Sequence, residues 1–158
     1  RFSRNKRSYK IMANGYKGEK TITLYHVDYL MTINMDVIAE FQSETGKDFM
    51  AVGMQALNAY YKSRSETSPL ARAELMTNAI SMSDAAYLFY IAAKYSNKNV
   101  EFGEIQEAIL LEGALENTDT VSYPLLFVGL IEFALIGVVD DVKKKRLQNL
   151  MSDDSKSS

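Results

Sequence analysis

The stretch Leu125-Leu-Phe-Val-Gly-Leu-Ile-Glu-Phe-Ala-Leu-Ile-Gly-Val-Val139 places the strongest constraint on the fold of this chain. Glu132 is its only polar residue, so a helix formed by the stretch would be apolar on every side. Such a helix needs cover all round, whereas a helix with one apolar stripe faces a single core. The cover can come from the same chain, from a second copy or from another protein. Because a membrane span takes about 20 apolar residues and this stretch is shorter, with a central carboxylate, we expect no membrane contact.

A surface for self-association or for a partner protein is expected on this predicted helix. Gly129 and Gly137 share a helix face with Phe133, and a glycine inside a helix costs up to about 1 kcal/mol relative to alanine. Two such glycines indicate either close approach by another helix or room for large core side chains. The candidate surface consists of Phe127, Gly129, Leu130, Ile131, Phe133, Leu135 and Gly137.

Length and composition predict one domain with one hydrophobic core. The chain has 158 residues, of which 47% are hydrophobic, enough to fill such a core. Residues 9–151 are predicted to form this single domain, between a flexible basic arm at 1–8 and a disordered polar tail at 152–158. The sequence has no cysteine, which excludes disulfides, zinc–cysteine sites and thiol nucleophiles and agrees with a reducing compartment.

Charge is unevenly distributed along the chain. The whole sequence has a net charge of -2, yet residues 1–20 contain seven Lys or Arg and one Glu, a net +6 that leaves -8 on the remainder. The basic side chains of this arm, interleaved with aromatic residues, could contact nucleic acid. We favour a solvated terminus instead, because an acidic body repels phosphate. The candidate residues of the basic arm are Arg1, Arg4, Lys6, Arg7 and Lys10.

Hydrophobic periodicity and turn residues predict a mainly α-helical, compact domain of about five to six helices with a small N-terminal β-hairpin. The two strands are expected at Tyr9–Ala13 and Thr21–Val27, on either side of Asn14-Gly15. Capping residues then set the helix boundaries. Helices are expected from an Asn34 cap to Gly46, from an Asp48 cap to Lys62, from Pro69 to Ile80 after a Ser68 cap, from Asp84 to Tyr95 after a Ser83 cap, around Phe102 to Glu112, and from Ser122 through the apolar stretch.

No combination of residues in the sequence assembles a catalytic or metal site. His26 is the only histidine, so one chain cannot provide a two-histidine metal site, and we interpret it as a strand side chain beside Tyr25. Glu104 and Glu107 resemble the carboxylates of a di-iron helix, but that site needs Glu-x-x-His pairs, so we expect them on a solvated face. Nothing provides a nucleophile with its base and an orienting group. We therefore expect no catalytic residue, no metal, no cofactor and no enzymatic activity.

Two parts of the chain share a pattern with a known family. Thr32-Ile-Asn-Met-Asp-Val-Ile-Ala-Glu-Phe-Gln-Ser-Glu-Thr-Gly-Lys47 reads as an apolar and acidic helix that ends in Thr-Gly-Lys. Residues 80–94 read as a capped helix that runs toward a small-residue turn, and residues 99–110 read as the helix that follows. Together these segments resemble the first helix and the later helix pair of the tail assembly chaperones of long-tailed bacteriophages, of the siphophage type. The resemblance covers residues 20–113 in order.

The resemblance implies a non-enzymatic protein that coats the tape-measure protein before the tail tube polymerises around it, and that helps recruit tail tube subunits. Such a protein would act as a homo-oligomer in the cytoplasm of the infected bacterial host, with grooves for amphipathic helices of its partner. Eight methionines, which can adapt to varied apolar partners, are compatible with that role. The alternative function is a small helical adaptor or regulator that contacts nucleic acid through its basic N-terminal arm.

Overall fold

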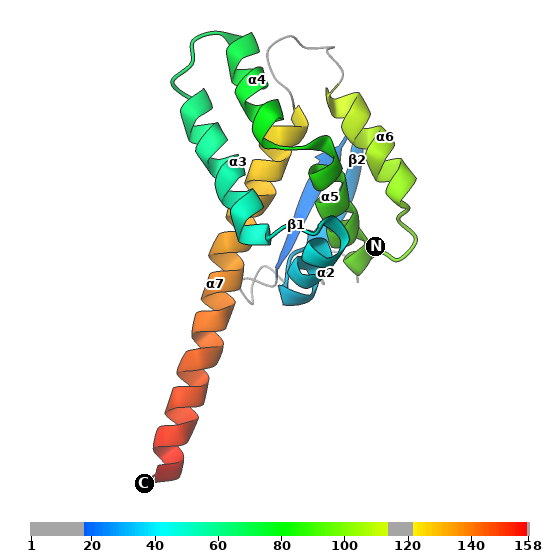
Figure 1. The fold of residues 1–158 in the computed structure, drawn as a ribbon. Helices are drawn as coiled ribbons and strands as arrows, with labels where there is room; N and C mark the ends of the chain where they lie inside the picture. Colours follow the sequence, from blue (N-terminus) through cyan, green and yellow to red (C-terminus); the bar gives the residue numbers. More distant parts are fainter. Residues whose placement is uncertain (1–17, 114–121, 158) are drawn as a thin grey trace.

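The computed structural model describes residues 18–113 and 122–157, and it confirms the predicted fold class, a mainly helical domain with a small β-hairpin at its N-terminal end (Figure 1). Helix α5 lies at the centre and contacts strand β2 and helices α2, α6 and α7. The described elements are β1 (Glu19–Leu24), β2 (Val27–Thr32), α2 (Met35–Thr45), α3 (Phe49–Ser63), α4 (Pro69–Ala79), α5 (Met82–Ser96), α6 (Phe102–Gly113) and α7 (Ser122–Ser157).

The hairpin differs from the predicted one in its position along the chain. Strands β1 and β2 are antiparallel, and Tyr25 and His26 form the turn between them. The predicted strand at Thr21–Val27 was therefore wrong in extent, because it includes the end of β1 and the turn, and His26 is a turn residue rather than a strand residue. The other predicted strand, at residues 9–13, lies outside the described residues.

An unusual backbone conformation explains why the turn escaped detection. Tyr25 and His26 have φ values of 42° and 71°, in the left-handed region that hairpin turns usually fill with Asn or Gly. The Tyr25 backbone N–H donates a hydrogen bond to the side chain of Glu112, which lies on α6. A carboxylate that is distant in sequence therefore supports a turn that carries no local sequence signal.

The predicted caps of α2 and α3 are confirmed. The Asn34 side chain accepts a hydrogen bond from the Val37 backbone N–H, and Gly46 ends α2 with a φ of 69°, a conformation that glycine adopts without strain. Asp48 caps α3 by accepting a hydrogen bond from the Ala51 N–H at 3.0 Å. These local signals can be read from sequence because the cap and its acceptor or donor lie within one helical turn.

One predicted cap was wrong. Ser68 caps α4 ahead of Pro69, as expected. At α5, however, the capping residue is Ser81 rather than Ser83, since the Ser81 hydroxyl accepts a hydrogen bond from the Asp84 backbone N–H. Both serines precede an apolar run, but Ser83 lies within the first turn of α5.

The Glu104 side chain caps the start of α6 and also connects this helix to the sheet. The Glu104 carboxylate accepts a hydrogen bond from the Glu101 backbone N–H at 2.9 Å, which is half of a capping box. The same carboxylate accepts a hydrogen bond from the Tyr29 hydroxyl on β2, also at 2.9 Å. Glu104 and Glu107 are both exposed, in line with the expected solvated face.

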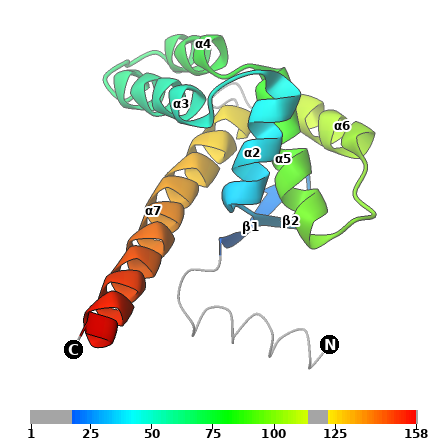
Figure 2. The same cartoon turned by 60° about the horizontal axis from the view of Figure 1, so that its bottom comes forward.

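The last helix is longer than the apolar stretch that predicted it. Helix α7 has 36 residues, and its C-terminal part leaves the body of the domain as a single projecting helix (Figures 1 and 2). From Val139 to Ser152 every described side chain is exposed. The expectation of a disordered tail was wrong for residues 152–157, because the helix continues through them. After Gly137 the sequence has neither Gly nor Pro, so it contains no strong helix breaker.

The first half of α7 completes the hydrophobic core. Phe127 on α7 packs edge to face against Phe89 on α5, with ring centroids 6.2 Å apart. Leu130 and Ile131 have no exposed surface. Helix α3 approaches closely at Gly53, where an added Cβ would lie 3.1 Å from Cγ2 of Ile131. The cover that the apolar stretch requires is therefore provided mainly by the same chain.

Shortening a buried side chain of α7 to alanine should lower the stability of the fold far more than shortening an exposed one. We expect Leu130→Ala to lower the free energy of unfolding by about 2–5 kcal/mol, because it leaves a cavity at a fully buried site. Ile136→Ala is the matched control, since Ile136 is 67% exposed and its truncation should change stability by less than about 0.5 kcal/mol. Urea denaturation followed by circular dichroism measures both. Equal losses of unfolding free energy in the two variants would contradict the burial of Leu130 and the exposure of Ile136.

The link between Tyr29 and Glu104 should appear in the pH dependence of stability. Burial, together with the hydrogen bond to the Glu104 carboxylate and the charge of that carboxylate, raises the pKa of Tyr29 to about 12. Because this pKa is raised above its value of about 10 in the unfolded chain, the stabilisation is complete below about pH 10 and is lost as the pH rises toward 12. We compare the free energy of unfolding of the native protein with that of Tyr29→Phe. Between about pH 9 and about pH 12, the native protein should lose roughly 1–2 kcal/mol more of this free energy than the variant does. If the difference in unfolding free energy between the native protein and Tyr29→Phe stays constant over this pH range, the hydrogen bond between Tyr29 and Glu104 is contradicted.

Candidate interaction surface

The predicted partner surface on α7 lies largely inside the domain. Phe127, Leu130 and Ile131 are fully buried and Gly137 is buried, so in the folded chain these residues are unavailable to a partner. The interpretation of the whole set as a sticky surface is corrected accordingly, because α3 and α5 pack on this half of α7. The half-buried members of the set are Gly129, Phe133 and Leu135.

The two glycines predicted to allow close helix approach have different surroundings. An added Cβ at Gly129 would lie 3.8 Å from Nζ of Lys20, which comes from strand β1 rather than from a helix. The Lys20 ammonium also lies 5.7 Å from the centroid of the Phe133 ring, within range of a cation–π interaction. The close helix contact is instead made by a glycine on the other helix, Gly53 of α3, which sequence inspection did not single out.

Exposed apolar side chains continue along the projecting part of α7. We call residues 139–151 the free half of α7, because every described side chain in this range is exposed. Leu147, Leu150 and Met151 are 60%, 64% and 67% exposed, so large apolar side chains lie close together on this part of the helix. The same half contains the basic run Lys143–Arg146. The sequence of the free half has four basic residues and two aspartates, a net charge of +2, and no other described element of the chain packs on it.

A second exposed apolar surface lies on α3. Its residues are spaced four, seven and eleven positions from the first, which places them on one face of the helix. Two are methionines with half of their surface exposed, and the last is an exposed tyrosine. We call this surface the α3 stripe, and it consists of the exposed Met50, Met54 and Tyr61 and of Leu57, which is partly buried against the core.

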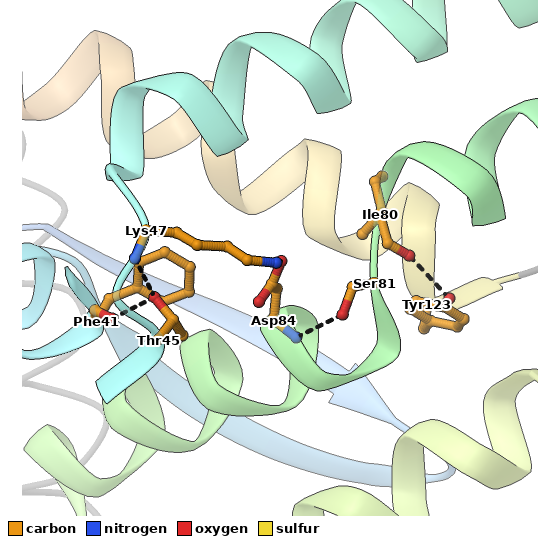
Figure 3. A network of polar contacts seen from close by, with 7 residues as sticks. All are labelled: Phe41, Thr45, Lys47, Ile80, Ser81, Asp84 and Tyr123. Carbon is orange, nitrogen blue, oxygen red and sulfur yellow. Dashed lines mark hydrogen bonds and ion pairs between the residues drawn. The ribbon is translucent and has the colours of Figure 1, made fainter. Parts of the chain in front are cut away.

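The segments that carry the family resemblance are joined by an ion pair (Figure 3). Lys47, which ends the Thr-Gly-Lys motif after α2, lies with its Nζ 2.8 Å from Oδ2 of Asp84 near the start of α5. The Asp84 carboxylate is largely buried, whereas the Lys47 side chain remains half exposed. Thr45 supports the same corner, since its hydroxyl donates to the Phe41 carbonyl and accepts from the Lys47 backbone N–H.

A neighbouring hydrogen bond fixes α7 to the same corner. The hydroxyl of Tyr123, at the start of α7, donates to the carbonyl of Ile80 at 3.0 Å, one residue before the Ser81 cap of α5 (Figure 3). Burial raises the pKa of Tyr123, so this hydroxyl is neutral and able to donate at physiological pH. The polar contacts of this corner therefore hold helices together, and none of them provides a nucleophile with a base.

The remaining predicted sites divide between those that the structure describes and those outside it. The basic arm (Arg1, Arg4, Lys6, Arg7 and Lys10) lies outside the described residues. Within residues 18–113 and 122–157, no three His, Asp or Glu side chains are grouped as a metal site would require. In the same ranges, no helix combines the length and apolar content of a membrane crossing.

Comparisons with models of known protein families, with curated proteins and with solved structures found no match to this chain.

Proposed function

We propose that this protein is a non-enzymatic tail assembly chaperone of a long-tailed bacteriophage, which coats the tape-measure protein as an oligomer and helps recruit tail tube subunits. It would act in the cytoplasm of the infected bacterial host. The proposal rests on the sequence resemblance over residues 20–113 and on the way in which the structure uses the resembling residues.

The observation that carries the proposal is the contact between the two resembling segments. Lys47 and Asp84 come from different segments, and their ion pair joins α2 to α5. A second, longer contact of the same kind joins Glu40 to Lys94, with 3.4 Å between the charged atoms. If the resembling residues were scattered over the surface, a chance similarity would be the simpler explanation. Instead, the helices that these segments form pack on one another, α2 on α5 and α5 on α6, which supports a shared scaffold.

The α3 stripe provides a surface of the kind that such a chaperone needs. A chaperone of an amphipathic helical partner must cover apolar stripes of varied sequence. Methionine is suited to this task, because its unbranched, polarisable side chain adapts to differently shaped neighbours. Met50 and Met54 present such side chains next to each other on α3, and Tyr61 extends the stripe by almost two further turns. We assign the tape-measure protein to this stripe.

Co-expression tests the proposal. With the tape-measure protein encoded in the same genome, the native chain should keep that partner soluble and should co-purify with it. The variant Met50→Glu/Met54→Glu should lose most of the soluble complex, because two charges would be desolvated against an apolar partner. Both methionines are at least half exposed, so this variant should still fold.

A matched control carries the same added charge on the same helix. Gln55→Glu/Asn58→Glu places two carboxylates at exposed positions beside the stripe, and it should retain the complex. Circular dichroism checks that both variants are folded. If the native chain fails to co-purify with its own tape-measure protein, the proposed function is wrong. If both variants lose the soluble complex to the same extent, the α3 stripe is not the surface that binds the tape-measure protein.

A further inference from the structure

The outer face of α6 complements the free half of α7 in charge and in apolar character. Exposed Glu104 and Glu107 lie on one face of α6, and the exposed Leu110 and Leu111 follow one turn later. We call these four residues the α6 face. On α7, Lys143, Arg146, Leu147 and Leu150 likewise share one face, with basic residues first and leucines after them.

The spacing of the two surfaces also agrees. Glu104, Glu107 and Leu111 are separated by three and four residues, and Lys143, Arg146 and Leu150 are separated by the same intervals. If the two helices lie parallel, Glu104 falls level with Lys143, Glu107 with Arg146, and Leu111 with Leu150. A single alignment of the two helices therefore places each acidic residue beside a basic residue and also places leucine beside leucine.

The two surfaces cannot meet within one molecule. Helix α6 lies on one side of the body, and the free half of α7 projects from the other side in both views (Figures 1 and 2). A contact between them therefore requires two copies of the chain. We propose that the free half of α7 in one copy docks on the α6 face of the next copy.

Charge favours this occupant over a second α7. Two free halves packed together would bring the basic run Lys143–Arg146 of one copy toward that of the other. The body of the domain is instead acidic, since residues 18–113 contain seven Lys or Arg against 13 Asp or Glu. The free half, with a net charge of +2 that is concentrated in Lys143–Arg146, is therefore attracted to the body of another copy, and the α6 face combines acidic residues with exposed leucines.

The contact is heterologous, which determines the form of the assembly. Each copy that docks its α7 leaves its own α6 face open for a further copy, so association continues into a ring or an open chain. This inference extends the oligomeric part of the proposed function but is tested on the purified chain alone. If the chain fails to bind the tape-measure protein, the contact between α7 and α6 can still be correct. If the chain does not self-associate, the contact is wrong, but binding of the tape-measure protein is still tested by co-expression.

Engineered disulfides test the contact directly, because the native sequence has no cysteine. In mild oxidant, the double variant Leu111→Cys/Leu150→Cys should form a ladder of disulfide-linked multimers. An equimolar mixture of the two single variants should form linked dimers and nothing larger, and each single variant alone should stay unlinked. Self-linking of Leu150→Cys alone would show α7 pairing with α7 and would overturn the proposal, as would the absence of linked species in the double variant.

Charge reversal provides the second measurement, by sedimentation velocity. Arg146→Glu and Glu107→Arg should each weaken self-association by about tenfold or more, since each places like charges in the contact. An equimolar mixture of the two should recover association, because the reversed charges then match in both directions, and so should the double variant. Lys62→Glu is the control, with the same kind of charge change at an exposed position on α3. A strictly monomeric native chain at high concentration, or reversal variants that behave like Lys62→Glu, would refute the contact.

Discussion

The burial of the first half of α7 is the constraint on which the rest of the structure depends. This helix has no polar stripe that could face water over its first turns, so other elements must surround it. Helices α3 and α5 do so, and Gly53 allows α3 to come within contact distance of Ile131. The polar corner around Tyr123 fixes where the helix enters the domain. Its direction in turn determines where the free half emerges.

The parts of the fold that sequence could predict are those with local causes. The caps at Asn34, Asp48 and Ser68 each act within one helical turn, and the structure confirms them. The Tyr25–His26 turn was missed because the carboxylate that supports it lies 87 residues further along the chain. In α7, periodicity revealed an all-round apolar helix, but which side chains meet the core depends on how distant elements pack. The residues predicted to form a partner surface are therefore largely buried in the core.

The structure separates core packing from exposed apolar surface, which the sequence analysis had placed in one segment. The apolar stretch of α7 serves the core, while exposed apolar residues lie further along α7, on α3 and on α6. A protein that holds a helical partner and also associates with its own kind needs separate surfaces for these contacts, because a partner on one must not displace the other. The α3 stripe and the free half of α7 lie on different helices and meet that requirement.

Hydrogen–deuterium exchange along α7 tests most directly the claim that one helix has an anchored half and a free half. At a concentration low enough to keep the chain monomeric, amides of residues 125–136 should exchange only through global unfolding, whereas amides of residues 143–151 should exchange much faster. Raising the concentration should protect the second group without changing the first. Equal protection of both groups in the monomer, or rapid exchange at 125–136, would contradict this account of the fold.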